Sequence, residues 1–438
     1  MKVLILDKEI PYLLHGILCA QDIEVDVFAD VFEGGDPFYT AMRDHYEPRF
    51  NLCTLQEIEM RLPRYDTVFI NELPVNVFPL GISHPNVIGC VHPEIELDKV
   101  FFKKIATELG CRVPSMQDID LHGSLPDMHN WLDRDFMIKV RNQEKCGNRL
   151  FSFHAKSVRA ASSFLRYCQT ASGRDIGFGT DASVFIEEFI KGDEVGVGAW
   201  FDGTSFVAPY HMWFEYKKML AHDVGPNIEE LGVVCRVVPT RQVRQSQLCR
   251  ILVRFEQYLR DIGYVGYFAL NAIVTDKVVY LLECDARFPN PGLLAIAHTC
   301  NLKDLLANPK AQQTVYPERW HVCGSVVSLG FPWAHAVGQQ IGGVDVSLPS
   351  GCNVVPINLI DQNVSEIHRR LYKTPPPAFC DFGRIAEVIG SGETLQDART
   401  AWLSHMNNIE YPFALWRYDI GINDEKFERT IIRDYEGY

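Results

Sequence analysis

Residues 266–292 have the sequence GYFALNAIVTDKVVYLLECDARFPNPG, which predicts two strands joined by a turn. Phe268 to Val274 is apolar except at one position, and Val278 to Leu282 is apolar throughout. Asp276-Lys277 between the two runs favours a tight turn. The stretch is therefore predicted to be a largely buried β-hairpin.

Three polar side chains interrupt this hairpin: Asn271, Glu283 and Asp285. Residues two apart on a strand share a face, so the two acids project together, and Asn271 on the partner strand is placed to face them. Two carboxylates and an amide suit Mg²⁺ or Mn²⁺, which take oxygen ligands and keep waters or phosphate oxygens in their other positions. Arg287 adds a fixed cation for phosphate or carboxylate. The alternative is a hairpin with a solvated polar edge.

Length and composition limit the classes of protein to consider. The 438 residues exceed one hydrophobic core and predict about two to four domains. A net charge of -14 argues against general affinity for nucleic-acid backbones or anionic membranes. The opening MKVLILDKE has the pattern of a short strand followed by charge, not of a signal peptide, and no apolar run approaches a membrane span. Thirteen cysteines without CxxC pairs indicate reduced thiols and a cytoplasmic protein.

Residues 1–97 have the pattern of a small α/β unit. Short apolar runs predict strands at Lys2 to Leu6, Thr67 to Asn71 and Val87 to Val91. The first strand is followed by Asp7-Lys8-Glu9 and not by a glycine-rich phosphate loop.

A helix is predicted from Asp98, as its N-cap, to Leu109, before Gly110. Its apolar face is expected at Val100, Phe101, Ile105 and Leu109. Lys99, Lys103 and Lys104 lie near its start, and without further context they are expected to be solvated on a surface helix.

Phe136 to Val140 predicts a strand whose only polar residue is Lys139, and a second strand is expected at Leu150 to Phe153. The basic loop Arg141 to Arg149 between them contains Lys145 and one glycine. Such a loop suits phosphates through its backbone N–H groups and lysine charge, and an exposed hairpin tip is the alternative.

Strands are also predicted at Ser183 to Ile190 and Val195 to Phe201, with Lys191-Gly192-Asp193-Glu194 as the turn between them. Backbone groups after Glu187 would contact an adenine edge, and Glu194 would accept hydrogen bonds from ribose; a plain polar loop is the alternative. The stretch from His211 to Gly232 is expected to be irregular, with Gly225-Pro226-Asn227 as a turn.

One core helix is predicted over Ser246 to Ile262 from its apolar period, ending at Gly263. Further along, Arg384 to Ile389 predicts a strand and Leu395 to Met406 an amphipathic helix. Pro375-Pro376-Pro377 predicts a rigid extended stretch.

Together these segments resemble the ATP-grasp ligases, and within them the phosphoribosylamine–glycine ligase (glycinamide ribonucleotide synthetase) family, from Asp98 to Gly421. Six stretches match motifs of this family, and they occur along the chain in the same order as in the family. The matching stretches are Asp98-Lys99-Val100-Phe101-Phe102-Lys103, Phe136 to Lys139, Phe185-Ile186-Glu187-Glu188-Phe189 with Gly192 and Glu194, Lys217 eight residues before Gly225, Glu283-Cys284-Asp285-Ala286-Arg287-Phe288, and Trp416-Arg417-Tyr418-Asp419-Ile420-Gly421.

The resemblance implies a multidomain α/β and α+β protein with an ATP-grasp fold. It implies an N-terminal α/β domain at 1–97, an ATP-grasp core at 98–112 and 186–330, a lid at 113–185 and a C-terminal α+β domain at 331–438. It implies ATP and Mg²⁺ (or Mn²⁺) as cofactors, with Arg287 and Lys217 catalytic and Glu283, Asp285 and Asn271 as metal ligands. The residues implied for ATP are Lys99, Lys139, Lys145, Glu187, Glu188, Phe189, Ile190 and Glu194.

The chain also departs from the family. Asp7-Lys8-Glu9-Ile10-Pro11 replaces its glycine-rich first loop, Glu229-Glu230-Leu231 replaces Gly-Gly-Met after Gly-Pro-Asn, Asp285 replaces the metal asparagine, and its C-domain Phe-His-Ala-Gly-Thr is missing. The motifs that the resemblance assigns to ATP are kept, whereas those that it assigns to the acceptor substrate differ.

Three hypotheses follow for a monomer or homodimer without membrane contact. The first is a ligase that joins a small carboxylate, expected to be an amino acid, to an amine through an acylphosphate. The alternative within this class is phosphoribosylamine–glycine ligase activity itself. The second is a nucleotide-binding homologue without ligase activity. The third is a ligase whose amine belongs to a modified nucleoside or a polymer.

Overall fold

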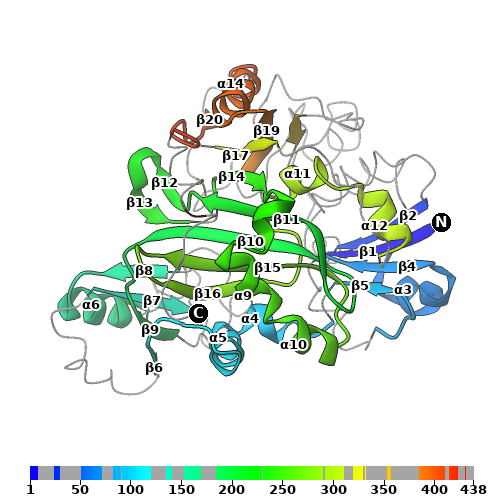
Figure 1. Ribbon diagram of the computed structural model, residues 1–438, viewed down its shortest axis with the longest axis horizontal. Coiled ribbons are helices and arrows are strands. Elements are labelled where there is room, and N and C mark those ends of the chain that lie inside the picture. The colour runs from blue at the N-terminus through cyan, green and yellow to red at the C-terminus, as the bar shows by residue number, and fades with distance from the viewer. Residues whose placement is uncertain are drawn as a thin grey trace, which may run out of the picture.

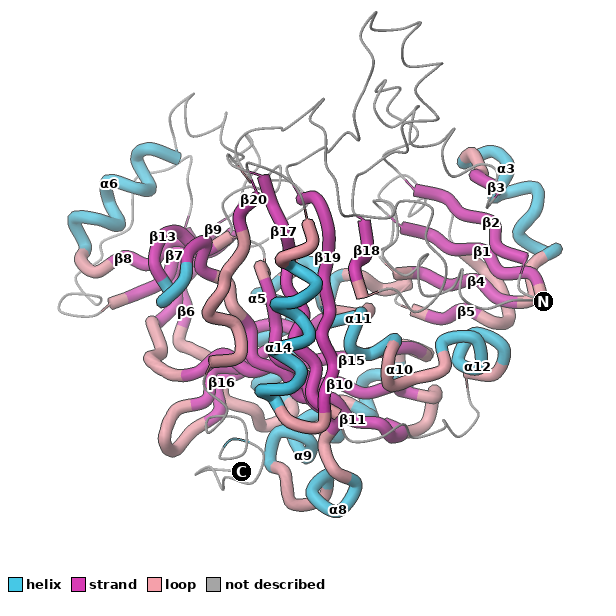
Figure 2. Tube along the Cα trace, turned by 90° about the horizontal axis from the view of Figure 1, so that it is seen from above, coloured by secondary structure: helices cyan, strands magenta, loops and turns pink. Residues whose placement is uncertain are grey.

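The computed structural model covers the whole chain. It describes residues 1–7, 24–29, 51–71, 82–89, 91–119, 135–140, 152–168, 184–228, 230–289, 292–309, 319–328, 331, 353–356, 384–409, 414–422 and 430. Three larger sheets organise these residues, and a large antiparallel sheet lies between two smaller ones (Figure 1, Figure 2).

The N-terminal sheet has five parallel strands in the order β3-β2-β1-β4-β5. Its strands are β1 Lys2–Asp7, β2 Glu24–Ala29, β3 Asn51–Leu52, β4 Thr67–Ile70 and β5 Val87–Ile88. The strands β1, β4 and β5 confirm the predicted runs, although β5 is shorter than expected. Val3 to Leu6 is fully buried, as expected for a parallel strand covered on both faces.

The large sheet has nine strands in the order β16-β15-β10-β11-β14-β17-β19-β18, with β20 paired to β17. Every pairing in it is antiparallel. The strands are β10 Asp193–Phe201, β11 Phe206–Glu215, β14 Gly232–Val237, β15 Gly266–Val274, β16 Val279–Asp285, β17 Trp320–Ser328, β18 Val354–Pro356, β19 Arg384–Gly392 and β20 Ala414–Leu415. The C-terminal strands therefore extend the same sheet that contains the 266–292 hairpin.

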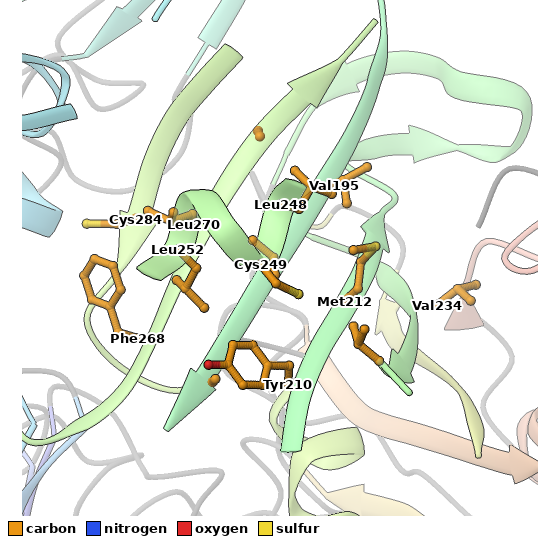
Figure 3. Packing of buried hydrophobic residues seen from close by; sticks show 14 of the residues in the cluster. Val195, Tyr210, Met212, Val234, Leu248, Cys249, Leu252, Phe268, Leu270 and Cys284 are labelled. Carbon is orange, nitrogen blue, oxygen red and sulfur yellow. The ribbon is translucent and has the colours of Figure 1, made fainter. Parts of the chain in front are cut away.

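The main core lies where helices α9 (Gln247–Val253) and α10 (Glu256–Asp261) pack on this sheet. Leu248, Cys249 and Leu252 of α9 face apolar side chains of the central strands (Figure 3). The apolar period is confirmed, but the expected single helix is interrupted at Arg254 and Phe255.

The small sheet has four antiparallel strands in the order β6-β9-β7-β8, with α6 (Val158–Cys168) packed on it (Figure 1). Its strands are β6 Met116–Ile119, β7 Phe136–Val140, β8 Ser152–Ala155 and β9 Val184–Glu188. β7 has the predicted bounds. β8 begins after Leu150. The turn after β9 lies two residues earlier than predicted, because β9 ends at Glu188 and β10 begins at Asp193.

The predicted lysine-bearing helix is α5 (Lys99–Glu108), capped by the Asp98 side chain and followed by Gly110 in the left-handed region at φ 75°. The predicted C-terminal helix is α14 (Leu395–Met406), capped by Thr394. The remaining helices are α3 Leu55–Arg61, η2 Leu62–Arg64, α4 Glu94–Leu97, η6 Ala221–Asp223, α8 Thr240–Val243, α11 Gly292–Ala297 and α12 Leu302–Ala307.

The prediction that His211 to Gly232 is irregular is wrong. This stretch completes β11 and then forms a hairpin of β12 (Lys218–Leu220) and β13 (Val224–Asn227). Gly225-Pro226-Asn227 lies within β13, because Gly225 adopts φ 92° inside the strand and the turn is made by the residues before it. No helix among the described ranges is both long and apolar enough to cross a membrane.

Candidate active site

The β15–β16 hairpin places its polar side chains as the sequence predicts. Asn271 is the register partner of Glu283, and its Nδ2 lies 3.4 Å from Asp285 Oδ2. The three side chains therefore converge on one face of the hairpin, at the edge of the large sheet.

Asn271 gives the clearest sign that this face accepts a cation. Its side chain is 3% exposed, and its Oδ1 atom has no hydrogen-bond partner among the described residues. A buried carbonyl oxygen without a donor is costly unless a cation or other donor satisfies it. No group of three or more His, Cys, Asp or Glu side chains suited to a metal occurs in the part of the chain that the structure describes. Two carboxylates and one amide fit Mg²⁺ that keeps phosphate oxygens and waters in its other positions.

Arg287 lies beside Asp285, as predicted, and Glu96 of α4 fixes it there. Arg287 Nε lies 2.7 Å from Glu96 Oε1, and Arg287 Nη2 lies 3.5 Å from Asp285 Oδ1. Burial raises the pKa of Asp285 to about 7, against the opposing effect of Arg287. Burial thus disfavours the ionised form of this carboxylate, and a bound cation would favour it.

The expectation that the α5 lysines are solvated is wrong for two of the three. Lys99 and Lys103 are buried, one helical turn apart, whereas Lys104 is exposed. Lys99 Nζ lies 2.5 Å from Glu283 Oε2. The predicted apolar face is only partly buried, because α5 turns its Lys99, Phe102, Lys103 and Ala106 side inward.

Glu187 of β9 links α5 to the small sheet. Its carboxylate forms ion pairs with Lys103 and with Lys139 of β7, the latter at 2.5 Å. Burial lowers the pKa of Lys103 to about 8, whereas Glu187 raises the pKa of Lys139 against the effect of burial. The predicted phosphate lysine Lys139 thus reaches the site with an acidic partner already in place.

The chain after Glu187 is only partly available to an adenine edge. Glu188 N donates to Ser115 O, and Phe189 N donates to Asp135 O at 3.2 Å. The Phe189 ring stacks on His154 with centroids 4.0 Å apart, and Ile190 is buried. The structure therefore presents aromatic and apolar surface at this edge.

Lys217 follows β11 and lies among four glutamates. Its Nζ is 2.6 Å from Glu194, 2.9 Å from Glu215, 3.4 Å from Glu283 and 4.0 Å from Glu230. These carboxylates raise the pKa of Lys217 well above its ordinary value against the effect of burial. Burial and Glu215 raise the pKa of Glu230 well above its ordinary value. This end of the site has an excess of acid that favours cationic ligands.

Sequence reasoning missed Lys103, Glu96 and Glu215 as members of the site. Glu215 has a side chain only 1% exposed and accepts a 2.9 Å hydrogen bond from Trp213 Nε1. Trp213 fits there because its register partner is Gly196, where a Cβ would overlap the indole. Residues two apart on a strand share a face, so the alternation of β11 could have predicted that Glu215 lies on the same face as Trp213.

Several predicted residues lie outside the described residues. They are Lys145 with the loop Arg141 to Arg149, Lys8 to Pro11, Glu229 and the triple proline. The roles predicted for them stay predictions.

Comparison with known proteins shows which family and which solved structures this chain resembles. The family model for the phosphoribosylglycinamide synthetase ATP-grasp (A) domain matches residues 155–293. A crystal structure of phosphoribosylamine–glycine ligase from Thermotoga maritima superposes with a TM-score of 0.70 at 18% identity, over 96% of this chain and 100% of that one. The chain has an ATP-grasp fold. An L-amino acid ligase from Bacillus licheniformis shares this fold with a TM-score of 0.59 at 12% identity, over 95% and 99% of the two chains.

Sequence relatives confirm the resemblance of the ATP-grasp region to phosphoribosylamine–glycine ligases. The enzyme from Clostridium acetobutylicum is 23% identical over 57% of this chain and 58% of its own length. The enzyme from Caulobacter vibrioides is 27% identical over 55% of this chain and 56% of its own. The matched region thus spans little more than half of these relatives.

Proposed function

We propose that this protein is an ATP-dependent ligase that joins a small carboxylate, such as an amino acid, to an amine with release of ADP and phosphate. The observation that supports this most is the convergence of Asn271, Glu283 and Asp285 with Lys99, Lys139 and Lys217 where the two antiparallel sheets meet. Oxygen ligands for Mg²⁺ next to several buried lysines provide what a triphosphate requires. The relatives named above support the same chemistry.

A carboxylate is a poor electrophile, so the γ-phosphate must first be transferred to it, and the amine then displaces phosphate to form the amide. This chemistry depends on charge neutralisation and alignment more than on acid–base groups. Lys99 and Lys139 neutralise phosphate oxygens, and Arg287, held by Glu96, steadies the transferring phosphoryl group or the substrate carboxylate. Lys217 lies between the proposed metal ligand Glu283 and the acids Glu215 and Glu230, so it would be near both the nucleotide phosphates and the side where the amine would enter.

Asn271, Glu283 and Asp285 are the residues that would hold Mg²⁺. The ion would neutralise charge on the β- and γ-phosphates when bound. Lys99 and Lys217 hold the pKa of Glu283 well below its ordinary value despite burial, so this carboxylate is ionised and ready for a cation.

No cysteine nucleophile is required. The described free cysteines are buried, and burial raises the pKa of Cys249 to about 11 and of Cys300 to about 12. Thiols with such pKa values are protonated at neutral pH and are weak nucleophiles.

The small sheet with α6 is proposed to be the lid of the nucleotide site. It corresponds to the predicted lid at 113–185, although its strand β9 extends to Glu188. Residues 331–438 are proposed to form a C-terminal domain even though β18, β19 and β20 join the large sheet. A cytoplasmic location and a monomer or homodimer remain part of this proposal.

The test is ADP formation by the purified chain with ATP, Mg²⁺ and pooled amino acids and amines, followed by mass detection of the new amide. Sustained ADP formation by a ligase requires both a carboxylate and an amine, because the acylphosphate turns over only when the amine displaces phosphate. A thermal shift with Mg²⁺ and ATP but no turnover with any pool would instead indicate a nucleotide-binding homologue without ligase activity.

A further inference from the structure

The segment Trp416–Gly421 has no part in the site described above, yet it contacts the chain on both sides of Lys217. The Arg417 guanidinium lies over the Tyr216 ring, 5.0 Å from its centroid, and Arg417 Nη1 donates to the Lys218 carbonyl at 3.1 Å. Gly421 N donates to Tyr216 Oη at 3.1 Å. The two chain neighbours of Lys217 are thus both held by the C-terminal segment.

Arg417 is itself fixed in one orientation. Its Nε and Nη2 donate to the two carboxylate oxygens of Asp419 at 2.9 and 2.6 Å, and the residue is 1% exposed. A two-point guanidinium–carboxylate pair fixes the plane of the guanidinium, which lysine would not do.

The same pair holds the turn of the β12–β13 hairpin. Asp419 Oδ2 accepts from His222 N at 2.8 Å, and Arg417 Nη1 lies 3.0 Å from Asp223 Oδ1. His222 and Asp223 adopt φ of 59° and 56°, a left-handed conformation that residues other than glycine avoid unless contacts compensate. The contacts with Arg417 and Asp419 supply that compensation.

The hairpin connects this turn to Lys217 and to the small sheet. Ile228 N donates to Lys217 O at 2.9 Å, which extends the β12–β13 pairing to the lysine itself. Asn227 Nδ2 donates to Ser152 Oγ of β8 at 2.9 Å, where β13 lies beside β8 (Figure 2). A shift of the hairpin would therefore move Lys217 relative to Glu194 and Glu283.

We propose that Arg417 and Asp419 are positioning residues for Lys217, so that the C-terminal segment completes the nucleotide site through the β12–β13 hairpin. This inference rests on the proposed function, because it concerns how Lys217 is held near the nucleotide. It assigns no contact with substrate to Arg417 or Asp419.

The test compares Asp419→Asn, Lys217→Met and the double variant of the full chain, with Mg²⁺ and the non-hydrolysable analogue AMP-PNP as the calorimetric probe. Asp419→Asn keeps the shape of the side chain and weakens its pairing with Arg417. It is expected to raise the Kd for AMP-PNP roughly 10- to 100-fold, as small displacements of a positioned group do. Tyr418→Phe is the matched control, because it removes only a hydroxyl contact with His222 at a half-exposed residue, and its Kd should stay at the wild-type value.

The double-variant cycle separates positioning from general destabilisation. If Asp419 acts through Lys217, adding Asp419→Asn to Lys217→Met weakens binding no further. Equal Kd values for wild type and Asp419→Asn, or full additivity in the double variant, would overturn the inference alone. A wild-type chain that binds no AMP-PNP with Mg²⁺ would refute the proposed function, and the inference with it.

A second variant covers the case in which Asp419→Asn does not fold. Asp223→Asn retains the Arg417–Asp419 pair, and asparagine tolerates the left-handed backbone. It removes one exposed ion pair and should raise the Kd about two- to five-fold, an effect that Lys217→Met abolishes. If Asp223→Asn binds like wild type, Arg417 has a structural role only.

Discussion

Lys103 of α5 forms a fully enclosed ion pair with Glu187 of β9, and the same carboxylate also receives Lys139 from β7. The two lysines differ in exposure: the side chain of Lys103 is 0% exposed and that of Lys139 is 11% exposed. One acid thus ties the helix of the core to the small sheet through Lys103 and leaves Lys139 at the rim of the site. This difference predicts distinct roles for two lysines that share one partner.

Lys103→Met is expected to lower the free energy of unfolding by about 3 kcal/mol, the lower end for loss of one partner of a buried pair, because Glu187 keeps Lys139. Denaturant unfolding measures this effect.

Lys139→Met is expected to weaken ATP binding about 10- to 100-fold, since a charged hydrogen bond to phosphate is lost. Calorimetry with ATP and Mg²⁺ measures the change in affinity. Unchanged ATP affinity in Lys139→Met would place that lysine outside the phosphate site.

Glu283→Gln is expected to keep the fold and reduce turnover to below about 1% of wild type, because an electrostatic group of the site is lost while the amide packs equally well. ADP formation measured against Mg²⁺ concentration checks this. Glu108→Gln at the exposed end of α5 is the matched control and should behave like wild type. Near-normal turnover of Glu283→Gln at saturating Mg²⁺ would refute the metal assignment.

Stability is expected to fall in acid because His211 and His321 are buried as neutral imidazoles. Burial lowers the pKa of each to about 3 from an ordinary value near 6.5. Between these pH values the unfolded chain binds protons that the folded chain does not, so the free energy of unfolding decreases as pH falls. Each histidine contributes about 1.4 kcal/mol per pH unit in that window.

His211→Gln removes one of these titrating groups and keeps a polar atom near Thr299 Oγ1, which lies 2.7 Å from His211 Nε2. Its free energy of unfolding should depend less steeply on pH between about 4 and 6 by that same increment. Chemical denaturation at several pH values measures the slope. Parallel slopes for the variant and wild type would show that His211 is protonated in the folded protein.

The parts of the fold that could be predicted depend on short-range patterns. The register of Asn271 with Glu283 follows from strand alternation, and the helix 395–406 follows from its cap and period. The partners of buried charges could not be predicted, because Lys103 and Glu187 are 84 positions apart and nothing local distinguishes Lys103 from the exposed Lys104. The β12–β13 hairpin was missed because Gly225-Pro226 is typical of turns, whereas here the turn consists of left-handed His222 and Asp223.

We expect the acceptor side of the site, which the family resemblance places after β1 and near Lys217, to have the wrong charge for a phosphorylated amine. Asp7 ends β1 as a buried acid that accepts a 2.9 Å hydrogen bond from Asn71, where a phosphate would require unobstructed backbone N–H groups. Glu215 adds a buried acid 2.9 Å from Lys217. Carboxylates at these positions repel a phosphate and attract an amine that has no other charge or additional positive charge.

We therefore expect the protein not to ligate glycine to phosphoribosylamine at a useful rate, and to use a neutral or cationic amine instead. Purified protein with ATP, Mg²⁺, glycine and phosphoribosylamine should release ADP no faster than without the amine, while pools of unphosphorylated amines should accelerate ADP release. Complementation of a purine auxotroph that lacks the glycinamide ribonucleotide step gives an independent readout. Rescue of that strain, or robust glycinamide ribonucleotide formation in vitro, would show that the acidic residues near Asp7 and Lys217 do not exclude a sugar phosphate.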